Sequence, residues 1–135
     1  MADSNFSQCR QALDNLDFLR RQKQETLSRL RELDDRMAIT EGEIEAARSE
    51  LQRILDKIES IGQSAISCAV GDKRDCLTLL VGLANEQHAF EAKIGRLGDK
   101  LRSLSVERDG VQSRVMGLDA DISRTEVFLS DHRCW

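Results

Sequence analysis

The 135-residue chain contains no proline and no tyrosine, and only 4% of its residues are aromatic. Proline is the residue that most strongly breaks helices and fixes turns, so its absence leaves long helices uninterrupted. Compact domains of this size normally draw on large aromatic side chains for their cores. The shortage of aromatics therefore argues against a compact globule and fits a narrow core of Leu, Ile and Val between long helices.

The sequence also lacks long apolar runs and a strong excess of one charge. Its longest mainly apolar run, Leu77 to Ala84, is far too short to span a bilayer. The formal net charge is −4, with acids and bases interleaved, so there is no basic stripe for nucleic acid or an anionic membrane. The first five residues, Met-Ala-Asp-Ser-Asn, do not resemble a signal peptide. We expect a cytoplasmic protein that neither inserts into membranes nor binds nucleic acid.

Apolar residues recur at spacings of three and four along nearly the whole chain, in two heptad patterns. The first has a positions at Cys9, Leu16, Lys23, Leu30, Met37, Ile44, Leu51, Ile58 and Ala65, and d positions at Ala12, Leu19, Thr26, Leu33, Thr40, Ala47, Ile54, Ile61 and Cys68. The second has a positions at Leu80, Gln87, Ile94, Leu101, Arg108, Val115, Ile122 and Leu129, and d positions at Cys76, Leu83, Phe90, Leu97, Leu104, Val111, Leu118, Thr125 and His132. Patterns sustained this long predict a coiled coil.

The two patterns are out of phase by one residue. Continuing the first past Ala65 would put four charged residues at core positions, whereas a shift of one residue restores an apolar seam. Gly71 followed by Asp72 suits the end of one helix and the start of the next. We predict an all-α fold, a long antiparallel two-helix coiled-coil hairpin, as a single domain over residues 1–135. Its helices would cover about residues 5–68 and 74–132, with the tip at about 69–73.

Charge pairing across the predicted seam favours this hairpin. With the tip at Val70–Gly71, the attractive pairs are Lys57–Glu86, Glu50–Lys93, Glu43–Lys100, Arg36–Glu107, Arg48–Glu91 and Arg20–Asp119, and Arg29–Arg114 is the one like-charge pair. Each exposed pair contributes only about 0.2–1 kcal/mol, but together they select a register. A parallel homodimer is the main competitor, although acidic pairs in its second half would repel. Leu27 and Leu55 widen the seam, which makes dimerisation of hairpins into a four-helix bundle a further alternative.

Polar residues weaken the seam in places. Lys23 and Arg108 occupy a positions, where we expect their stems to cover the seam and their charges to point outward. Five glycines lie off the seam of the second helix, at positions 82, 95, 98, 110 and 117. Each costs about 1 kcal/mol of helix propensity, so we expect the second helix to be the softer one.

Apolar residues away from the seam are candidates for binding a protein partner. Those near the tip are Ile66, Val70, Leu77, Leu79 and Val81. Those near the open end of the hairpin are Phe6, Phe18, Val127, Phe128 and Trp135. A helix that is apolar on all sides is normally covered, which makes the tip the stronger candidate, because scattered exposed apolar residues are ordinary.

The four cysteines form two nearly symmetric pairs. Cys68 and Cys76 flank the predicted tip, while Cys9 and Cys134 flank the open end, so an oxidising compartment would allow two bridges. Because no secretory signal is seen, we favour free thiols that pack as small apolar residues. Cys9, His132 and Cys134 also converge, but without a CxxC motif they do not predict a zinc site.

Nothing in the sequence predicts catalysis or a cofactor. There is no glycine-rich phosphate loop, nucleophile elbow or metalloprotease helix, and His88 falls on the exposed face. A two-helix hairpin also lacks the concave pocket that small-molecule sites need. We therefore expect a non-enzymatic structural or adaptor protein without cofactor or metal. It would act as a spacer or assembly subunit of a larger complex through its tip and its open end.

Other interpretations use the same architecture. In size and hairpin form the chain resembles the stalk proteins of flagellar and type III export ATPases, which implies a stalk-like regulator whose helices insert into an ATPase ring. No residue motif carries this resemblance, and the chain is acidic where that family would be basic. A subunit of a tethering or kinetochore assembly and a parallel homodimeric scaffold are further alternatives.

Overall fold

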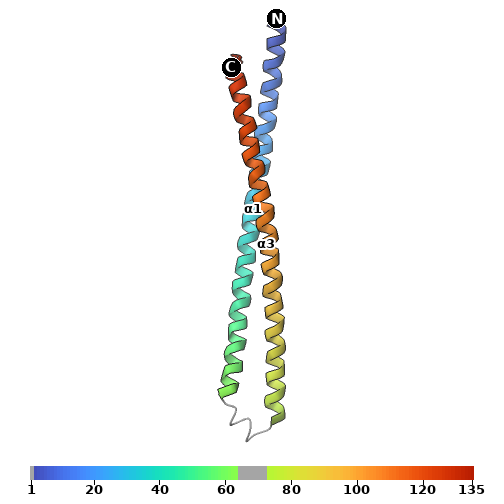
Figure 1. The fold of residues 1–135 in the computed structure, drawn as a ribbon, viewed down its shortest axis with the longest axis vertical. Helices are drawn as coiled ribbons and strands as arrows, with labels where there is room; N and C mark the ends of the chain where they lie inside the picture. Colours follow the sequence, from blue (N-terminus) through green and yellow to red (C-terminus); the bar gives the residue numbers. More distant parts are fainter. Residues whose placement is uncertain (1, 64–72) are drawn as a thin grey trace. The chain divides into compact units, whose positions relative to one another are not determined.

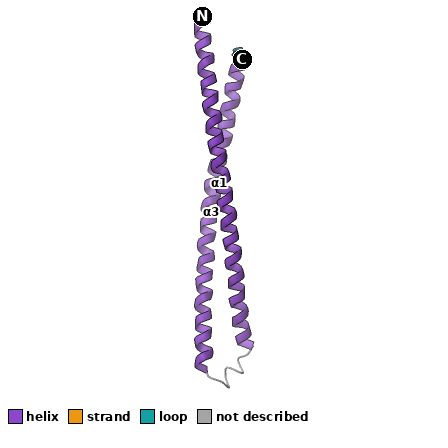
Figure 2. Ribbon diagram, turned by 180° about the vertical axis from the view of Figure 1, so that it is seen from behind, coloured by secondary structure: helices purple, strands orange, loops and turns teal. Residues whose placement is uncertain are grey.

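The computed structural model describes residues 2–63 and 73–135, and it consists of two long helices. Helix α1 spans Ala2–Gln63 and helix α3 spans Lys73–Asp131. The two helices pack against each other as a helical hairpin (Figure 1, and from behind in Figure 2). This confirms the predicted all-α hairpin. Because the helices pair within one chain, the parallel homodimer is not the arrangement seen.

The helix boundaries agree with the predicted ones to within a few residues where they are described. Helix α1 begins at Ala2, three residues earlier than predicted, and α3 begins and ends one residue earlier than predicted. Residues 64–72 lie outside the described residues. The candidate binding residues Ile66 and Val70 fall in that range, as do Cys68 and the predicted tip except for Lys73, which is the first residue of α3.

The hairpin divides into two compact units, each built from a stretch of both helices. The open-end unit contains Met1–Arg36 and Leu104–Trp135, and the tip unit contains Met37–Ser103. The predicted single-domain organisation stays a prediction. Each unit has its own part of the seam.

The core follows the two heptad patterns closely. Every described a and d position from Cys9 to Leu129 is buried or partly buried, and only His132 at the end of the second pattern is exposed. In the open-end unit, Leu16, Leu19, Ile122 and Leu129 form a buried cluster against which Ala12, Leu118 and Cys134 pack. The predicted register puts Leu19 opposite Ile122 and Ala12 opposite Leu129, and these residues do share one cluster. In the tip unit, Ile44, Ala47, Ile54 and Leu83 are the buried apolar residues.

Polar residues in the seam either form hydrogen bonds within their own helix or extend their charged ends to the edge of the seam. Thr26 and Thr40 are buried, and the Thr26 hydroxyl donates a hydrogen bond of 2.7 Å to the carbonyl of Gln22 in its own helix. The side chains of Lys23 and Arg108 are 36% and 31% exposed, so their stems cover the seam while their charged ends reach its edge. This confirms the expectation for both residues.

Candidate interaction surfaces

The open-end unit is closed by a specific turn at the end of α3. Arg133 has a φ of 53°, in the left-handed region that glycine normally occupies at a helix end. The amide of Cys134 donates to the carbonyl of Leu129 at 2.8 Å, and that of Arg133 donates to the carbonyl of Ser130 at 3.2 Å. These two bonds define a Schellman motif, which also packs Cys134 against the cluster containing Leu129. The turn therefore aims Cys134 back towards α1.

A disulfide bond joins Cys134 to Cys9 of α1. Their Cα atoms lie 5.3 Å apart, within the usual range for a bridge. The expectation of free thiols is therefore wrong for both residues, because the Schellman turn brings Cys134 beside the half-buried Cys9. Cys76 is also disulfide-bonded, and its predicted partner Cys68 lies outside the described residues.

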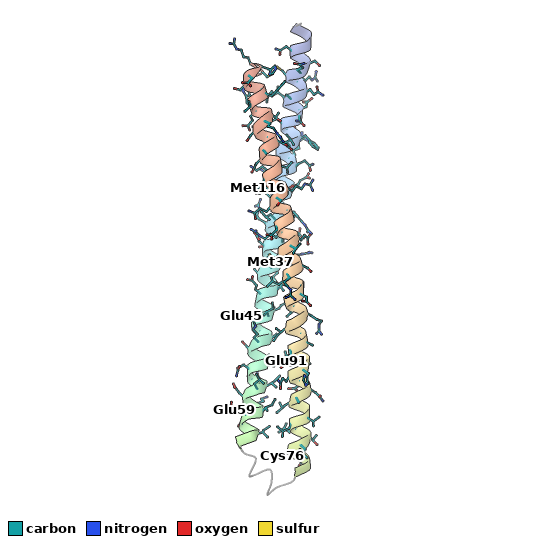
Figure 3. All side chains as sticks on the ribbon, viewed as in Figure 1. Met37, Glu45, Glu59, Cys76, Glu91 and Met116 are labelled. Carbon is teal, nitrogen blue, oxygen red and sulfur yellow. A yellow bond between two sulfur atoms is a disulfide. The ribbon has the colours of Figure 1, made fainter. Side chains whose placement is uncertain are left out.

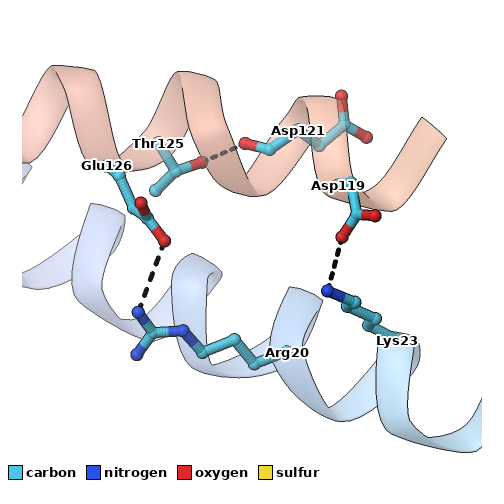
Figure 4. Close-up of polar contacts among 6 residues, drawn as sticks. All are labelled: Arg20, Lys23, Asp119, Asp121, Thr125 and Glu126. Carbon is cyan, nitrogen blue, oxygen red and sulfur yellow. Dashed lines mark hydrogen bonds and ion pairs between the residues drawn. The ribbon is translucent and has the colours of Figure 1, made fainter. Parts of the chain in front are cut away.

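Two ion pairs link the helices near the middle of the open-end unit (Figure 4). Arg20 lies 3.4 Å from Glu126, and the Lys23 ammonium lies 2.6 Å from Asp119. The sequence-based prediction pairs Arg20 with Asp119. That assignment is wrong because Lys23, whose ammonium reaches the edge of the seam, takes Asp119, while Arg20 turns to the acid seven residues further along α3.

The predicted like-charge pair between Arg29 and Arg114 is avoided in a similar way. Arg29 bonds to Glu107 of α3 and also lies 3.2 Å from Glu32 of its own helix. The hydrogen bond to Glu107, with a further one to Glu32, raises the pKa of Arg29 above its ordinary value. Glu107 lies one heptad before Arg114 on α3, and the arginine binds this acidic residue.

Arg108 is anchored to α1 by a carboxylate. Its Nε donates to Asp34, and its Nη1 donates to Gln112 at 2.9 Å. The hydrogen bond to Asp34 raises the pKa of Arg108. The interhelix ion pairs Lys23–Asp119 and Asp34–Arg108 join residues that lie within one position of the predicted level pairing. A shift of one heptad would move these partners about 10 Å apart along the axis, so the pairs confirm the register in this unit.

Two grooves lie in the open-end unit, and the disulfide lines one of them. One, of about 460 Å³, is lined by Asn5, Phe6, Cys9, Arg10, Leu13, Arg133 and Cys134. The other, of about 710 Å³, is lined by Gln8, Gln11, Ala12, Asn15, Arg124, Thr125, Phe128 and His132. In the second groove the rings of Phe128 and His132 stack with their centres 4.0 Å apart. The first groove is bordered by apolar and cationic side chains, and the second mainly by polar ones.

The structure separates the candidate residues of the open end. Phe6 lines the groove that contains the disulfide, whereas the half-buried Phe128 lines the other groove. Phe18, Val127 and Trp135 line neither groove, although they are 57%, 59% and 63% exposed. The open end thus offers several separate apolar positions and no single patch that joins them all.

At the start of α3, in the tip unit, three candidate residues are strongly exposed. Leu77, Leu79 and Val81 are 61%, 52% and 59% exposed. Cys76, labelled in Figure 3, precedes them on the seam side and is partly buried. Leu77 and Val81 are four residues apart and share one face of α3, whereas Leu79 points to a different side, so the three side chains lie on two sides of the helix outside its seam.

Sequence reasoning missed several exposed apolar residues. Leu13 is 40% exposed and shares a groove with Phe6, and their spacing of seven residues places both at e positions, which could have revealed the pair. Ile39, Val106 and Met116 are 61%, 73% and 67% exposed at scattered positions; Met116 is labelled in Figure 3. The importance of Arg133 was also missed, because its backbone conformation leaves no signal in residue type.

Neither α1 nor α3 carries an apolar stretch that would cross a bilayer. Within the described ranges, no three His, Cys, Asp or Glu side chains gather in a way that would hold a metal ion. Comparison with protein families, with curated proteins and with solved structures found no match.

Proposed function

We propose that this protein is a non-enzymatic structural or adaptor protein, a spacer or assembly subunit that binds protein partners through its tip unit and its open end. One observation carries the proposal. Leu77, Leu79 and Val81 lie within five residues of one helix and are all more than half exposed, with Leu77 and Val81 on one face and Leu79 on another. A helix that is apolar on all sides is normally covered by protein, and the partner helix of the hairpin covers only the seam.

The open end gives weaker support of the same kind. Phe6 and Trp135 are 68% and 63% exposed, and large aromatic residues are enriched at the centres of protein interfaces. The seam itself is occupied by the hairpin's own helices, so partner contacts fall on the residues outside it.

Site-specific photo-crosslinking in cells tests this function. A photoreactive residue placed at Leu79 or at Phe6 is expected to yield adducts larger than the chain itself, whereas the exposed shaft position Ser49 is expected to yield none above background. With the photoreactive residue at Val81 instead, Leu79→Glu should abolish the adducts formed near the tip while the helical circular dichroism stays unchanged. Absence of adducts at both Leu79 and Phe6 would refute the function, and loss of helicity in Leu79→Glu would assign that residue to the core.

We also infer that the protein works in an oxidising compartment and not in the predicted cytoplasm. Disulfide bonds persist in such compartments and are rare in the cytosol, and this structure closes its open end with the Cys9–Cys134 bond. Alkylation of cell lysates under denaturing conditions, followed by mass measurement, should find both cysteines protected. Full alkylation of Cys9 and Cys134 in cells would refute this inference and favour the predicted cytoplasmic location.

A further inference from the structure

Four exposed side chains form one row on α1 in the open-end unit, each four residues from the next. In order, the row reads Phe6, Arg10, Asp14 and Phe18. The two phenylalanines at its ends are 68% and 57% exposed. Among the described residues neither Arg10 nor Asp14 takes part in an ion pair or side-chain hydrogen bond, whereas Asp17 and Arg21 beside them pair with each other. The acid-before-base order of Asp17 and Arg21 is the favourable one on a helix, and Arg10 and Asp14 have the reverse order.

We propose that this row binds the same row of a second copy of the chain about a two-fold axis that passes between Arg10 and Asp14. Residues four apart form the ridges through which helices pack. The two-fold axis reverses the order of the row, which places Arg10 beside the partner's Asp14 and Phe6 beside the partner's Phe18. Each contact occurs twice because such an interface is isologous. The proposal rests on the proposed function, in which the open end binds protein, and it identifies that protein as a second copy.

The groove beside the row provides a place for the partner's aromatic ring. It has a volume of about 460 Å³ and is bordered by Phe6, Arg10 and Leu13 of α1 and by Arg133 from the end of α3. In the two-fold arrangement the partner's Phe18 lies next to Phe6 and enters this groove. The Schellman turn that holds Arg133 and Cys134 against α1 thus forms one wall of the dimer contact.

A second row of similar composition lies further along α1 and is an alternative partner for the first row. The order apolar, arginine, aspartate, apolar recurs 21 residues later at Leu27, Arg31, Asp35 and Ile39. Leu27 is only partly exposed, so that row presents one strongly exposed apolar end, whereas the first presents two. The first row also has the adjoining groove. The pairing is therefore expected between two copies of the first row.

The affinity of such a dimer should be modest. One row of side chains on each copy buries less than the roughly 1,000 Å² that stable interfaces exceed. We therefore expect a dissociation constant on the order of micromolar. The charged pairs lie beside the two-fold axis of a contact only one row wide, so salt still reaches them and dimerisation should weaken as salt is added.

Sedimentation equilibrium of the full disulfide-bonded chain, with a monomer mass of 15.3 kDa, measures this association. Arg10→Glu places acid beside acid in both contacts, and Asp14→Arg places base beside base. Each variant alone should raise the dissociation constant by about tenfold or more. An equimolar mixture of the two variants should dimerise again, because the exchanged charges then face each other with opposite sign. The double variant Arg10→Glu/Asp14→Arg should dimerise as the wild type does.

Arg31→Glu is the matched control, since it makes the same charge change on the same helix in the second row, and it should leave the dissociation constant unchanged. A wild-type chain that stays monomeric up to roughly millimolar concentration, above the range of ordinary weak contacts, overturns the proposal. So does a dimer that withstands Arg10→Glu, or one that Arg31→Glu disrupts. If dimerisation fails while Leu79 still crosslinks to another protein, only this inference is lost. If Leu79 and Phe6 both give no adducts, the proposed function is lost.

Discussion

Removing the disulfide between Cys9 and Cys134 should cost more stability than any other single change in the described structure. The bond joins residues 125 positions apart, so it closes a very long loop in the unfolded chain. The loop-entropy relation gives about 5 kcal/mol at 25 °C for a loop of this length. That figure is comparable to the lower end of the total stability of small proteins, about 5–15 kcal/mol.

The assay is urea unfolding followed by circular dichroism, with Cys9→Ala, Cys134→Ala and the double variant compared with the oxidised wild type. Substitution is preferable to a reductant because Cys76 is also disulfide-bonded. Any thiol left unpaired by a single substitution is alkylated first. Each single variant should lose the same free energy of unfolding, and the double variant should lose little more, because one bond is removed in all three.

Two results would refute this reasoning. Additive losses in the double variant would mean that the two cysteines contribute through separate packing contacts and not through a shared bond. A loss below about 1 kcal/mol in all three variants would mean that the bond is absent or that the unfolded chain already keeps its ends together.

The remaining predictions concern single residues. Arg133→Gly should raise the free energy of unfolding by about 1 kcal/mol, because glycine adopts the left-handed turn without penalty, while Ser130→Gly in the regular helix should lower it by a similar amount. Arg108→Leu should raise the melting temperature, since a solvent-screened pair with Asp34 contributes little and leucine fills the seam; a lower melting temperature would show that the pair outweighs the burial. Gly117→Ala should stabilise α3 by about 1 kcal/mol, as a Cβ there meets nothing within 4 Å, and a destabilised variant in thermal unfolding would contradict this.

The seam was predictable because it follows from a repeated pattern. The heptads correctly marked every described core position from Cys9 to Leu129, including the polar Thr26 and Thr40, because supercoiled helices keep the same face towards each other over many turns. The register at the open end was also predictable. It depended on many weak charge pairs acting together, so errors in individual pairs did not change it.

The individual partners were less predictable. Arg20 pairs with Glu126 and not with Asp119, and Arg29 pairs with Glu107 and with Glu32 of its own helix. A linear sequence does not show which partner a long, flexible side chain will bind. The disulfide was not predictable because the redox state of a cysteine depends on the compartment of the protein. A sequence indicates that compartment only through targeting signals. The turn at Arg133 could not be foreseen, because glycine or asparagine is the usual residue in its conformation.

The bond between Cys9 and Cys134 makes the intervening polypeptide a covalent ring. A protease that cuts once anywhere inside this ring leaves a single molecule, whose fragments separate only after the sulfur–sulfur linkage is broken. Tension applied at the two cysteines would likewise be borne by that linkage before it reached the packed leucines. For a spacer under mechanical load, the open end would therefore be the part that resists being pulled apart.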